Sequence, residues 1–274
     1  MPLLVKICGL STHETLDAAL AAGADMVGFV FFPASPRHLS LEKARELGAV
    51  AKGRATKVAL TVDADDATFE NIIETLRPDI LQIHGSETIA RVRDIKQKFG
   101  LPVMKVLPVE TAADLASLPG YAAVADRILF DARAPGDATR PGGLGATFDW
   151  HLLENLDLKL PFMVSGGLNA GNVAEAVRVA RAGGVDVSSG VERAPGIKDI
   201  EMIREFIRAA RATDLTSPLP VYGERSDRLG DPGEGDSPRT QLSTNLRREP
   251  LTPTLSPQTR GEGEETARQQ RQKN

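Results

Sequence analysis

Two short turns of small residues in the last third of the chain could bind a phosphate group. The strand-like run PFMV leads directly into Ser165-Gly166-Gly167, and the run VDV leads into Ser188-Ser189-Gly190. Glycine leaves the backbone N–H groups open to an anion, and a helix that begins just after such a turn adds its positive end. One Gly-Gly pair is most often an ordinary turn, but two such turns in succession favour a phosphate site.

Side chains that could transfer protons also stand at the ends of strand-like runs. Cys8 ends the run LVKIC, His84 ends LQIH and Asp131 ends ILFD. Taken alone, a single cysteine in a strand is usually a small core residue, and an aspartate at a strand end often caps a turn. His84 could line a ligand or be a buried core histidine, and Asp186, inside VDV, could face the ligand or orient its neighbours. Their chemistry therefore depends on a fold that brings these strand ends together.

A repeat of strand, turn and helix runs through the first 214 residues. The strand-like runs are rich in Val, Ile, Leu and Phe and mostly do not alternate with polar residues, which is typical of buried parallel strands. They span Leu3–Ile7, Met26–Phe31, Lys57–Val62, Ile80–Ile83, Val103–Val106, Arg127–Phe130, Phe162–Val164 and Val185–Val187. Helical patterns begin near Ser11, Ser40, Asp66, Ser86, Glu110, Asp149, Asn169 and Lys198. The first has the capping-box spacing of Ser11 with Glu14, and Asn169 is the expected cap of the seventh.

Eight such units predict an α/β fold, a parallel sheet closed into a (β/α)8 barrel. The alternative is an open doubly wound sheet, but the Gly-x-Gly-x-x-Gly fingerprint after the first strand is absent, which weakens it. Active sites of such barrels lie at the carboxyl ends of the strands. Cys8, His84, Asp131 and the two phosphate-type turns would then meet at one mouth.

Composition limits the classes of partner. The 274 residues are 41% hydrophobic, enough for a full core, and the formal net charge of −4 gives no basic footprint for nucleic acid. The beginning, MPLLVKICGL, lacks the features of a secretory signal, and no apolar run approaches the roughly 20 residues of a membrane span. One cysteine cannot form an internal disulfide, which is typical of a reducing compartment. We expect a cytoplasmic protein that binds neither nucleic acid nor membrane.

The composition changes sharply after Asp214. Residues 215–274 are rich in Pro, Gly, Ser, Thr, Arg and Glu and contain one aromatic residue, Tyr222. Such a segment cannot bury enough apolar surface to fold. We therefore expect residues 1–214 to form the catalytic barrel and residues 215–274 to be a disordered low-complexity tail that is not needed for function. A partner-binding role for the tail remains the alternative.

The motifs together resemble the phosphoribosylanthranilate isomerase family of tryptophan biosynthesis, over nearly all of Leu3 to Arg211. They are KICG, GFVFFPASPRHLS, LQIHG, LFDA followed by GGLGATFDW, SGGLN and GVDVSSGVE with PGIKD, in the family's order and spacing. The chain departs from the family at Gly143-Leu144-Gly145-Ala146, where Gly-Thr-Gly-Lys is common, and at Thr61-Val62-Asp63, where Val-Asn is common. The lost lysine removes a charge from the glycine-rich loop.

The resemblance implies an Amadori rearrangement that turns N-(5-phosphoribosyl)anthranilate, an aldosylamine, into an amino-deoxyketose. It assigns Asp131 as the general acid for ring opening and Cys8 as the base that takes the proton from C2′. Cys8 must then be available as thiolate, which a nearby cation could arrange. The chemistry needs no metal or redox cofactor, and we expect none.

The resemblance also implies how the substrate is bound. Arg37 matches the family position that pairs with the anthranilate carboxylate, where its guanidinium could bind in bidentate fashion, although an arginine in a loop is usually a solvated charge. His84 and Asp186 are candidate substrate contacts. The residues expected to bind the phosphate are Gly166, Gly167, Ser188, Ser189 and Gly190. The partner is thus a small phosphosugar-anthranilate. Whether the protein is a monomer or a homodimer stays open.

The sequence leaves three alternative functions. A related phosphosugar barrel such as indole-glycerol-phosphate synthase would need a lysine and a glutamate, and the histidine-pathway isomerase a pair of aspartates. A non-catalytic phospholigand-binding protein would leave Cys8 and Asp131 free to vary. An interaction protein would act through residues 215–274.

Overall fold

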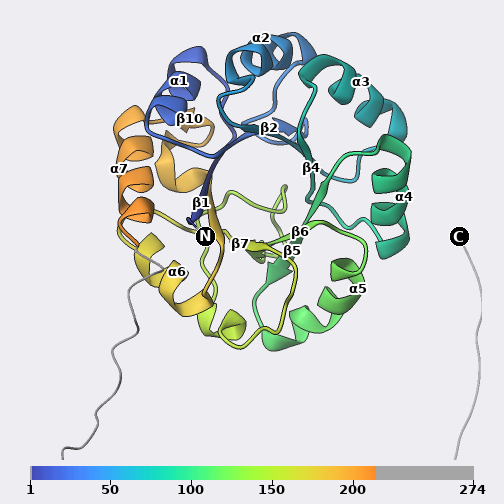
Figure 1. Ribbon diagram of the computed structural model, residues 1–274, viewed down its shortest axis with the longest axis vertical. Coiled ribbons are helices and arrows are strands. Elements are labelled where there is room, and N and C mark those ends of the chain that lie inside the picture. The colour runs from blue at the N-terminus through green and yellow to red at the C-terminus, as the bar shows by residue number, and fades with distance from the viewer. Residues whose placement is uncertain (1, 214–274) are drawn as a thin grey trace, which may run out of the picture. The chain divides into compact units, whose positions relative to one another are not determined.

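Eight parallel strands form a closed barrel in the computed structural model, which describes residues 2–213 (Figure 1). Each strand pairs with the next, and the pairing of Leu4 with Gly184 and Val5 with Val185 closes the ring between β1 and β8. The strands are β1 Leu4–Cys8, β2 Met26–Phe31, β3 Thr56–Thr61, β4 Ile80–Ile83, β5 Val103–Val109, β6 Arg127–Ala132, β7 Phe162–Val164 and β8 Gly184–Val187. This closure confirms the predicted (β/α)8 barrel and excludes the open sheet. The prediction for residues 215–274 lies outside the described residues.

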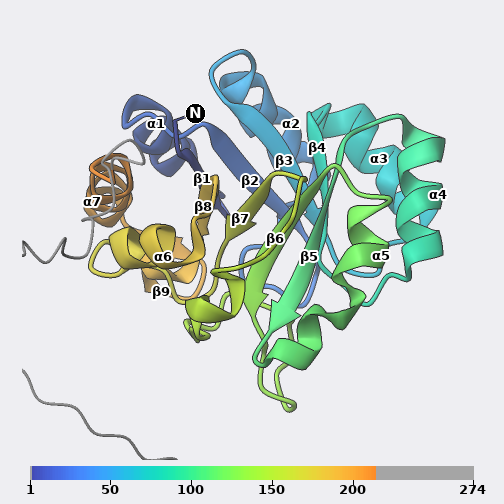
Figure 2. The same ribbon diagram turned by 60° about the horizontal axis from the view of Figure 1, so that its bottom comes forward.

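A ring of helices covers the outside of the barrel (Figures 1 and 2). The helices are α1 His13–Ala21, α2 Leu41–Ala51, α3 Asp66–Leu76, α4 Ile89–Phe99, α5 Leu118–Ala122, α6 Val173–Ala180 and α7 Ile200–Arg211. Short 3-10 turns are η1 Ala112–Ser117, η2 Trp150–Leu153 and η3 Ser189–Val191, and a hairpin of β9 Glu192–Ala194 and β10 Ile197–Lys198 precedes α7. Of the residues described, no helix is long and apolar enough to cross a membrane.

The helix predicted from Asp149 is wrong. Asp149 caps only the short turn η2, where its side chain accepts the N–H of His151. The residues that follow, ENLDLKLP, place leucines at every second position, and these leucines pack partly buried against the core. A period of two does not make a helix face. The connection between β6 and β7 is therefore mostly irregular.

The predicted capping box at Ser11 is also wrong, by one residue. Thr12 is the cap of α1, because its side chain accepts the N–H of Thr15 and also bonds to the Thr15 hydroxyl at 2.7 Å. Asn169 does not cap α6 either. It accepts the N–H of Gly171 in a preceding turn, and the helix begins four residues later, at Val173.

The α4 helix starts three residues after the predicted Ser86. Ser86 instead donates its N–H to the carboxylate of Asp63, and Glu87 accepts the N–H groups of Asp63 and Gly85. These bonds fix the chain that leaves β4. Lys105 on β5 completes this buried cluster with a 2.7 Å bond to Glu87.

Alternating residues of each strand point into the barrel. Inside the barrel a cluster of buried apolar side chains is formed by Met26, Val58, Ile80, Met104, Val106, Leu129 and Met163. Two residues further along their strands than Ile80 and Leu129, Gln82 and Asp131 line the pocket at the mouth. Val30 and Leu60 pack with Cys8 and also line it. Because strand side chains repeat with a period of two, this register aims the reactive residues at one opening.

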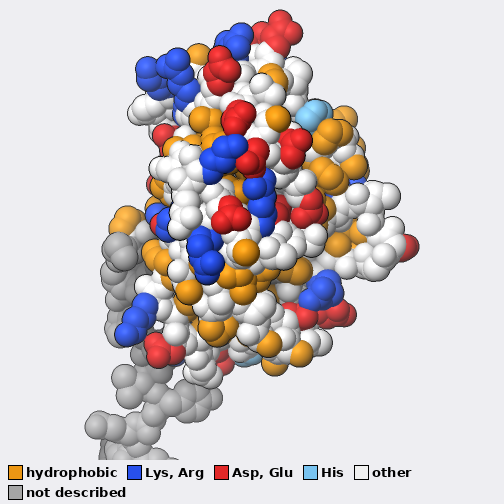
Figure 3. Space-filling model, turned by 90° about the vertical axis from the view of Figure 1, so that its right-hand side faces the viewer, with side chains coloured by type: hydrophobic (Ala, Val, Ile, Leu, Met, Phe, Trp, Pro, Cys, Tyr) orange, Lys and Arg blue, Asp and Glu red, His pale blue; other side chains and the backbone are white. Residues whose placement is uncertain are grey.

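The outer face around α3 and α4 mixes both signs of charge (Figure 3). Asp66 pairs with Arg91 and Lys98, and Lys98 also reaches Glu70. Such exposed pairs each contribute at most about 1 kcal/mol.

Candidate active site

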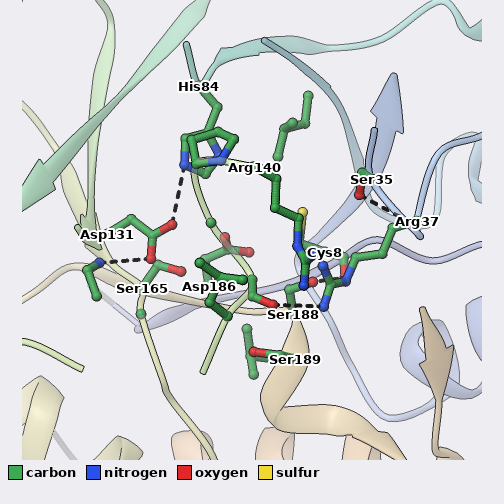
Figure 4. A pocket seen from close by; sticks show the side chains of 18 of the residues that line it. Cys8, Ser35, Arg37, His84, Asp131, Arg140, Ser165, Asp186, Ser188 and Ser189 are labelled. Carbon is green, nitrogen blue, oxygen red and sulfur yellow. Dashed lines mark hydrogen bonds and ion pairs between the residues drawn. The ribbon is translucent and has the colours of Figure 1, made fainter. Parts of the chain in front are cut away.

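One pocket at the carboxyl ends of the strands is lined by every site residue predicted from the sequence (Figure 4). These residues are Cys8, Arg37, His84, Asp131, Gly166, Gly167, Asp186, Ser188, Ser189 and Gly190. They come from β1, the loop after β2, and the ends of β4, β6, β7 and β8. Seven segments far apart in the sequence thus converge, counting the glycine-rich loop after β6 that covers part of the opening.

Cys8 is the last residue of β1; it is buried and lines the pocket. Burial raises the pKa of its thiol above the ordinary value, and the carboxylate of Asp186 adds to this. The positive charges of Lys6 and Lys198 oppose the shift without cancelling it. Two cations therefore lie near Cys8, where one was expected, yet the net shift of the pKa favours the neutral thiol.

Asp131 projects from β6 beside His84. One carboxylate oxygen accepts the N–H of Ala132 at 2.9 Å, and the other lies 3.3 Å from Nε2 of His84. Figure 4 shows this pair on the opposite side of the pocket from Cys8 and Arg37. A carboxyl group and a thiol thus face the same space from different directions.

Arg37 is buried, unlike the solvated arginine of an ordinary loop. Its Nε and Nη2 donate to the two carboxylate oxygens of Glu192, each at 2.7 Å, and Nη2 also donates to the carbonyl of Gly143 at 3.2 Å. The fork expected to bind a ligand carboxylate is therefore already used by Glu192. Only Nη1 remains for a ligand.

Glu192 and Lys198 form a buried pair that the sequence reasoning missed. Lys198 Nζ donates to Glu192 at 2.8 Å and to the carbonyl of Ser188 at 2.9 Å. Burial acts to raise the pKa of Glu192, but the hydrogen bonds from Arg37 and Lys198 and their charges outweigh it and hold the pKa below its usual value. Burial lowers the pKa of Lys198 despite Glu192. Glu192 closes the motif SSGVE, which was the only signal in the sequence.

The two small-residue turns lie side by side at the pocket. Within residues 2–213, the N–H groups of Gly166 and Gly167 have no acceptor. The Ser188 hydroxyl donates to the carbonyl of Cys8 at 3.2 Å, and Nζ of Lys198 donates to the Ser188 carbonyl at 2.9 Å. Free N–H groups and a nearby buried cation suit an anion with several oxygens.

Asp186 both faces the pocket and contacts a neighbouring side chain, the two roles that the sequence left open. It lines the pocket, and its carboxylate bonds to Nζ of Lys6 at 2.8 Å, with both side chains buried. The pair compensates two charges that would be costly alone.

Gln82 and Arg140 also line the pocket and were missed. Neither amide atom of Gln82 has a partner among the described residues, and the same is true of Nε of Arg140. Gln82 could have been found, because it stands two residues before His84 on the same strand and must face the same way. Arg140 lies in an irregular loop, where no periodicity indicates its direction.

Comparison with known families gives one match over most of the chain. The family model described as N-(5'phosphoribosyl)anthranilate (PRA) isomerase matches residues 5–209. A protein of that name from Bradyrhizobium sp. strain ORS 278 is 78% identical over 217 residues, which are 79% of this chain and 99% of that protein. Its counterpart in Rhodopseudomonas palustris strain BisB18 is 75% identical over 213 residues, covering 78% and 98%.

Solved structures agree. Phosphoribosyl anthranilate isomerase from Thermotoga maritima has a TM-score of 0.69 and 34% identity, covering 77% of this chain and 99% of that one. A phosphoribosyl anthranilate isomerase in complex with reduced 1-(o-carboxyphenylamino)-1-deoxyribulose 5-phosphate has a TM-score of 0.67 and 33% identity, with the same coverage.

Proposed function

The chain belongs to the N-(5'-phosphoribosyl)anthranilate isomerase family, and from this premise we propose how its pocket performs the reaction. The protein is an isomerase of tryptophan biosynthesis. It converts N-(5-phospho-β-D-ribosyl)anthranilate into 1-(2-carboxyphenylamino)-1-deoxy-D-ribulose 5-phosphate by an Amadori rearrangement.

Asp131 is the general acid. It protonates the furanose ring oxygen, the bond from that oxygen to C1′ breaks, and the nitrogen lone pair forms the Schiff base. Nε2 of His84 lies 3.3 Å from a carboxylate oxygen of Asp131 and orients this carboxyl group toward the pocket. His84 is thus a positioning residue for the acid.

Cys8 is the general base. As thiolate it removes the proton from C2′ of the Schiff base, and the electron pair moves toward nitrogen to give an enolamine that tautomerises to the ketose. Lys6 and Lys198 favour this thiolate, whereas burial opposes it. A thiol with a raised pKa is ionised in a smaller fraction but is a stronger base when ionised.

The substrate spans the pocket between two anion sites. Its phosphate binds the turns at Gly166-Gly167 and Ser188-Ser189-Gly190, and its anthranilate carboxylate lies on the side of Arg37. Asp186 lines the same pocket as these turns and Cys8. The carrying observation is that Cys8 and Asp131 line the same pocket as both phosphate-type turns.

Growth of a tryptophan auxotroph that lacks the isomerase tests the function. Cells that express this chain should grow without tryptophan, and cells that express a Cys8→Ser, Asp131→Asn double variant at equal level should not. Growth of the double variant would contradict the assignment of both residues.

Two further expectations accompany this proposal. We infer a cytoplasmic location, because a single cysteine suits a reducing compartment. The binding partner is the small-molecule substrate. The protein itself is a monomer or a homodimer; a phosphoribosylanthranilate isomerase from Thermotoga maritima is described as dimeric.

A further inference from the structure

The loop between β6 and η2 lies directly on the reactive side chains. A Cβ added at Gly142 would stand 2.6 Å from a carboxylate oxygen of Asp131 and 2.8 Å from the His84 ring, and one at Gly143 would stand 2.5 Å from Nη1 of Arg37. The loop backbone therefore packs against the acid and against the one free edge of Arg37. Arg140 enters the pocket just before these two glycines.

Arg140 differs from the other charged side chains at the pocket. Figure 4 shows its side chain pointing into the pocket, where its Nε is fully buried without an acceptor among the described residues. Arg37 is paired with Glu192. A buried guanidinium N–H without an acceptor is costly unless a ligand supplies one.

The anthranilate side of the pocket lacks a carboxylate-binding fork without Arg140. Glu192 accepts from Nε and Nη2 of Arg37 and, because it is shared with Lys198, compensates part of the Arg37 charge. The carbonyl of Gly143 accepts a further N–H of Nη2. A carboxylate is bound most strongly by two parallel N–H donors of an uncompensated guanidinium. The phosphate, in contrast, already has backbone N–H groups and Lys198 behind them.

We propose that Arg140 binds the anthranilate carboxylate as a second guanidinium beside Arg37 and makes the enzyme selective for a carboxylated ring. This inference rests on the proposed function and assigns a further specificity-determining residue to its site. Arg140 acts in binding, so its removal should raise KM much more than it lowers kcat.

The test uses two probes that differ only in the carboxylate. The first is reduced 1-(o-carboxyphenylamino)-1-deoxyribulose 5-phosphate, and the second is the same compound made from aniline, without the carboxylate. Calorimetry should show that Arg140→Gln weakens the first probe about tenfold or more, the usual value of a hydrogen-bonded charge. It should leave the second unchanged, and Arg140→Lys should recover part of the loss. Arg133→Gln is the control, because it removes an exposed cation of the same loop that does not line the pocket.

Two results would overturn the inference. Equal weakening of both probes would mean that Arg140 serves the phosphate or the loop's shape, and undiminished binding of the first probe would mean that it has no binding role. Turnover by the unmodified chain separates this test from the proposed function. If that chain isomerises the substrate and Arg140→Gln binds both probes normally, only the assignment of Arg140 fails.

Discussion

The pKa of the Cys8 thiol is set by opposing electrostatic influences from several neighbours. Burial and Asp186 favour the neutral thiol, and Lys6 and Lys198 favour the thiolate. Lys6 is itself bound to Asp186, and Lys198 to Glu192, so each cation acts on the sulfur with part of its charge compensated. This balance suits a base that ionises with difficulty and is then strongly basic.

The free enzyme should therefore show a thiol that titrates above the ordinary range. Because Cys8 is the only cysteine, the rate of alkylation by iodoacetamide reports on it alone. The rate should rise about tenfold per pH unit through neutrality and beyond the ordinary thiol pKa of about 8.5, since reactivity follows the thiolate fraction. Cys8→Ser is the control and should not react. A plateau below pH 8 would show that the lysines outweigh burial.

At this scale the sequence predicts the residues that stand at strand ends, and it misses those defined by distant partners. Cys8 and Asp131 could be named because motif and strand direction coincide. Glu192 could not, because its role comes from Arg37, which is 155 positions away in the chain. Arg140 could not either, because its loop has no periodic pattern.

At the scale of elements, the turn after β8 is shaped by close packing against the turn after β7. A Cβ at Gly190 would stand 1.8 Å from the carbonyl oxygen of Leu168, a backbone atom that cannot move away alone. The two phosphate-type turns are therefore fitted to each other and not only to a ligand.

Gly190→Ala should lower the free energy of unfolding by about 2 kcal/mol or more and weaken phosphate binding, because the turns must separate. Gly183→Ala is the matched control: its Cβ would lie 3.7 Å from its nearest neighbour, the carbonyl oxygen of Phe162, and its φ is not positive. Its stability should change by no more than about 0.5 kcal/mol. Thermal and urea unfolding with titration of inorganic phosphate measure both effects. Equal behaviour of the two variants would refute the argument.

Helix existence follows from sequence more reliably than helix starts. Ser11 and Thr12 are both good caps, and only the bond with Thr15 selects the second. Ser86 does not cap α4, because its N–H donates to the carboxylate of Asp63, which follows β3. Such competition is decided by neighbours in space, so the sequence alone cannot settle it.

For the whole molecule, the eight repeated strand–helix units predict a barrel, and the pairing of β1 with β8 closes it. Eight similar units with buried runs indicate parallel strands, but the pairing of β1 with β8 joins segments about 180 residues apart. That closure creates the buried pair of Lys6 and Asp186. The site thus depends on the last strand returning to the first.

We predict that residues 1–214 are sufficient for activity. A chain that ends at Asp214 should have the kcat and KM of the full chain and a free energy of unfolding within a few tenths of a kcal/mol, because the composition of residues 215–274 gives little apolar surface to bury. Steady-state kinetics and urea unfolding of both chains decide this. A loss of more than about 1 kcal/mol would indicate that the tail packs on the barrel.

The central claim is that Cys8 and Asp131 are separate and essential proton-transfer groups. The most direct measurement is kcat of Cys8→Ser and of Asp131→Asn, together with their affinity for reduced 1-(o-carboxyphenylamino)-1-deoxyribulose 5-phosphate. Each variant should lose about 100-fold or more in kcat, because a hydroxyl is not a base near neutrality and an amide is not an acid. Both should still bind the analogue, since the phosphate turns and the arginines are unchanged. A Cys8→Ser enzyme with nearly full kcat would contradict the account and reduce Cys8 to a packing residue.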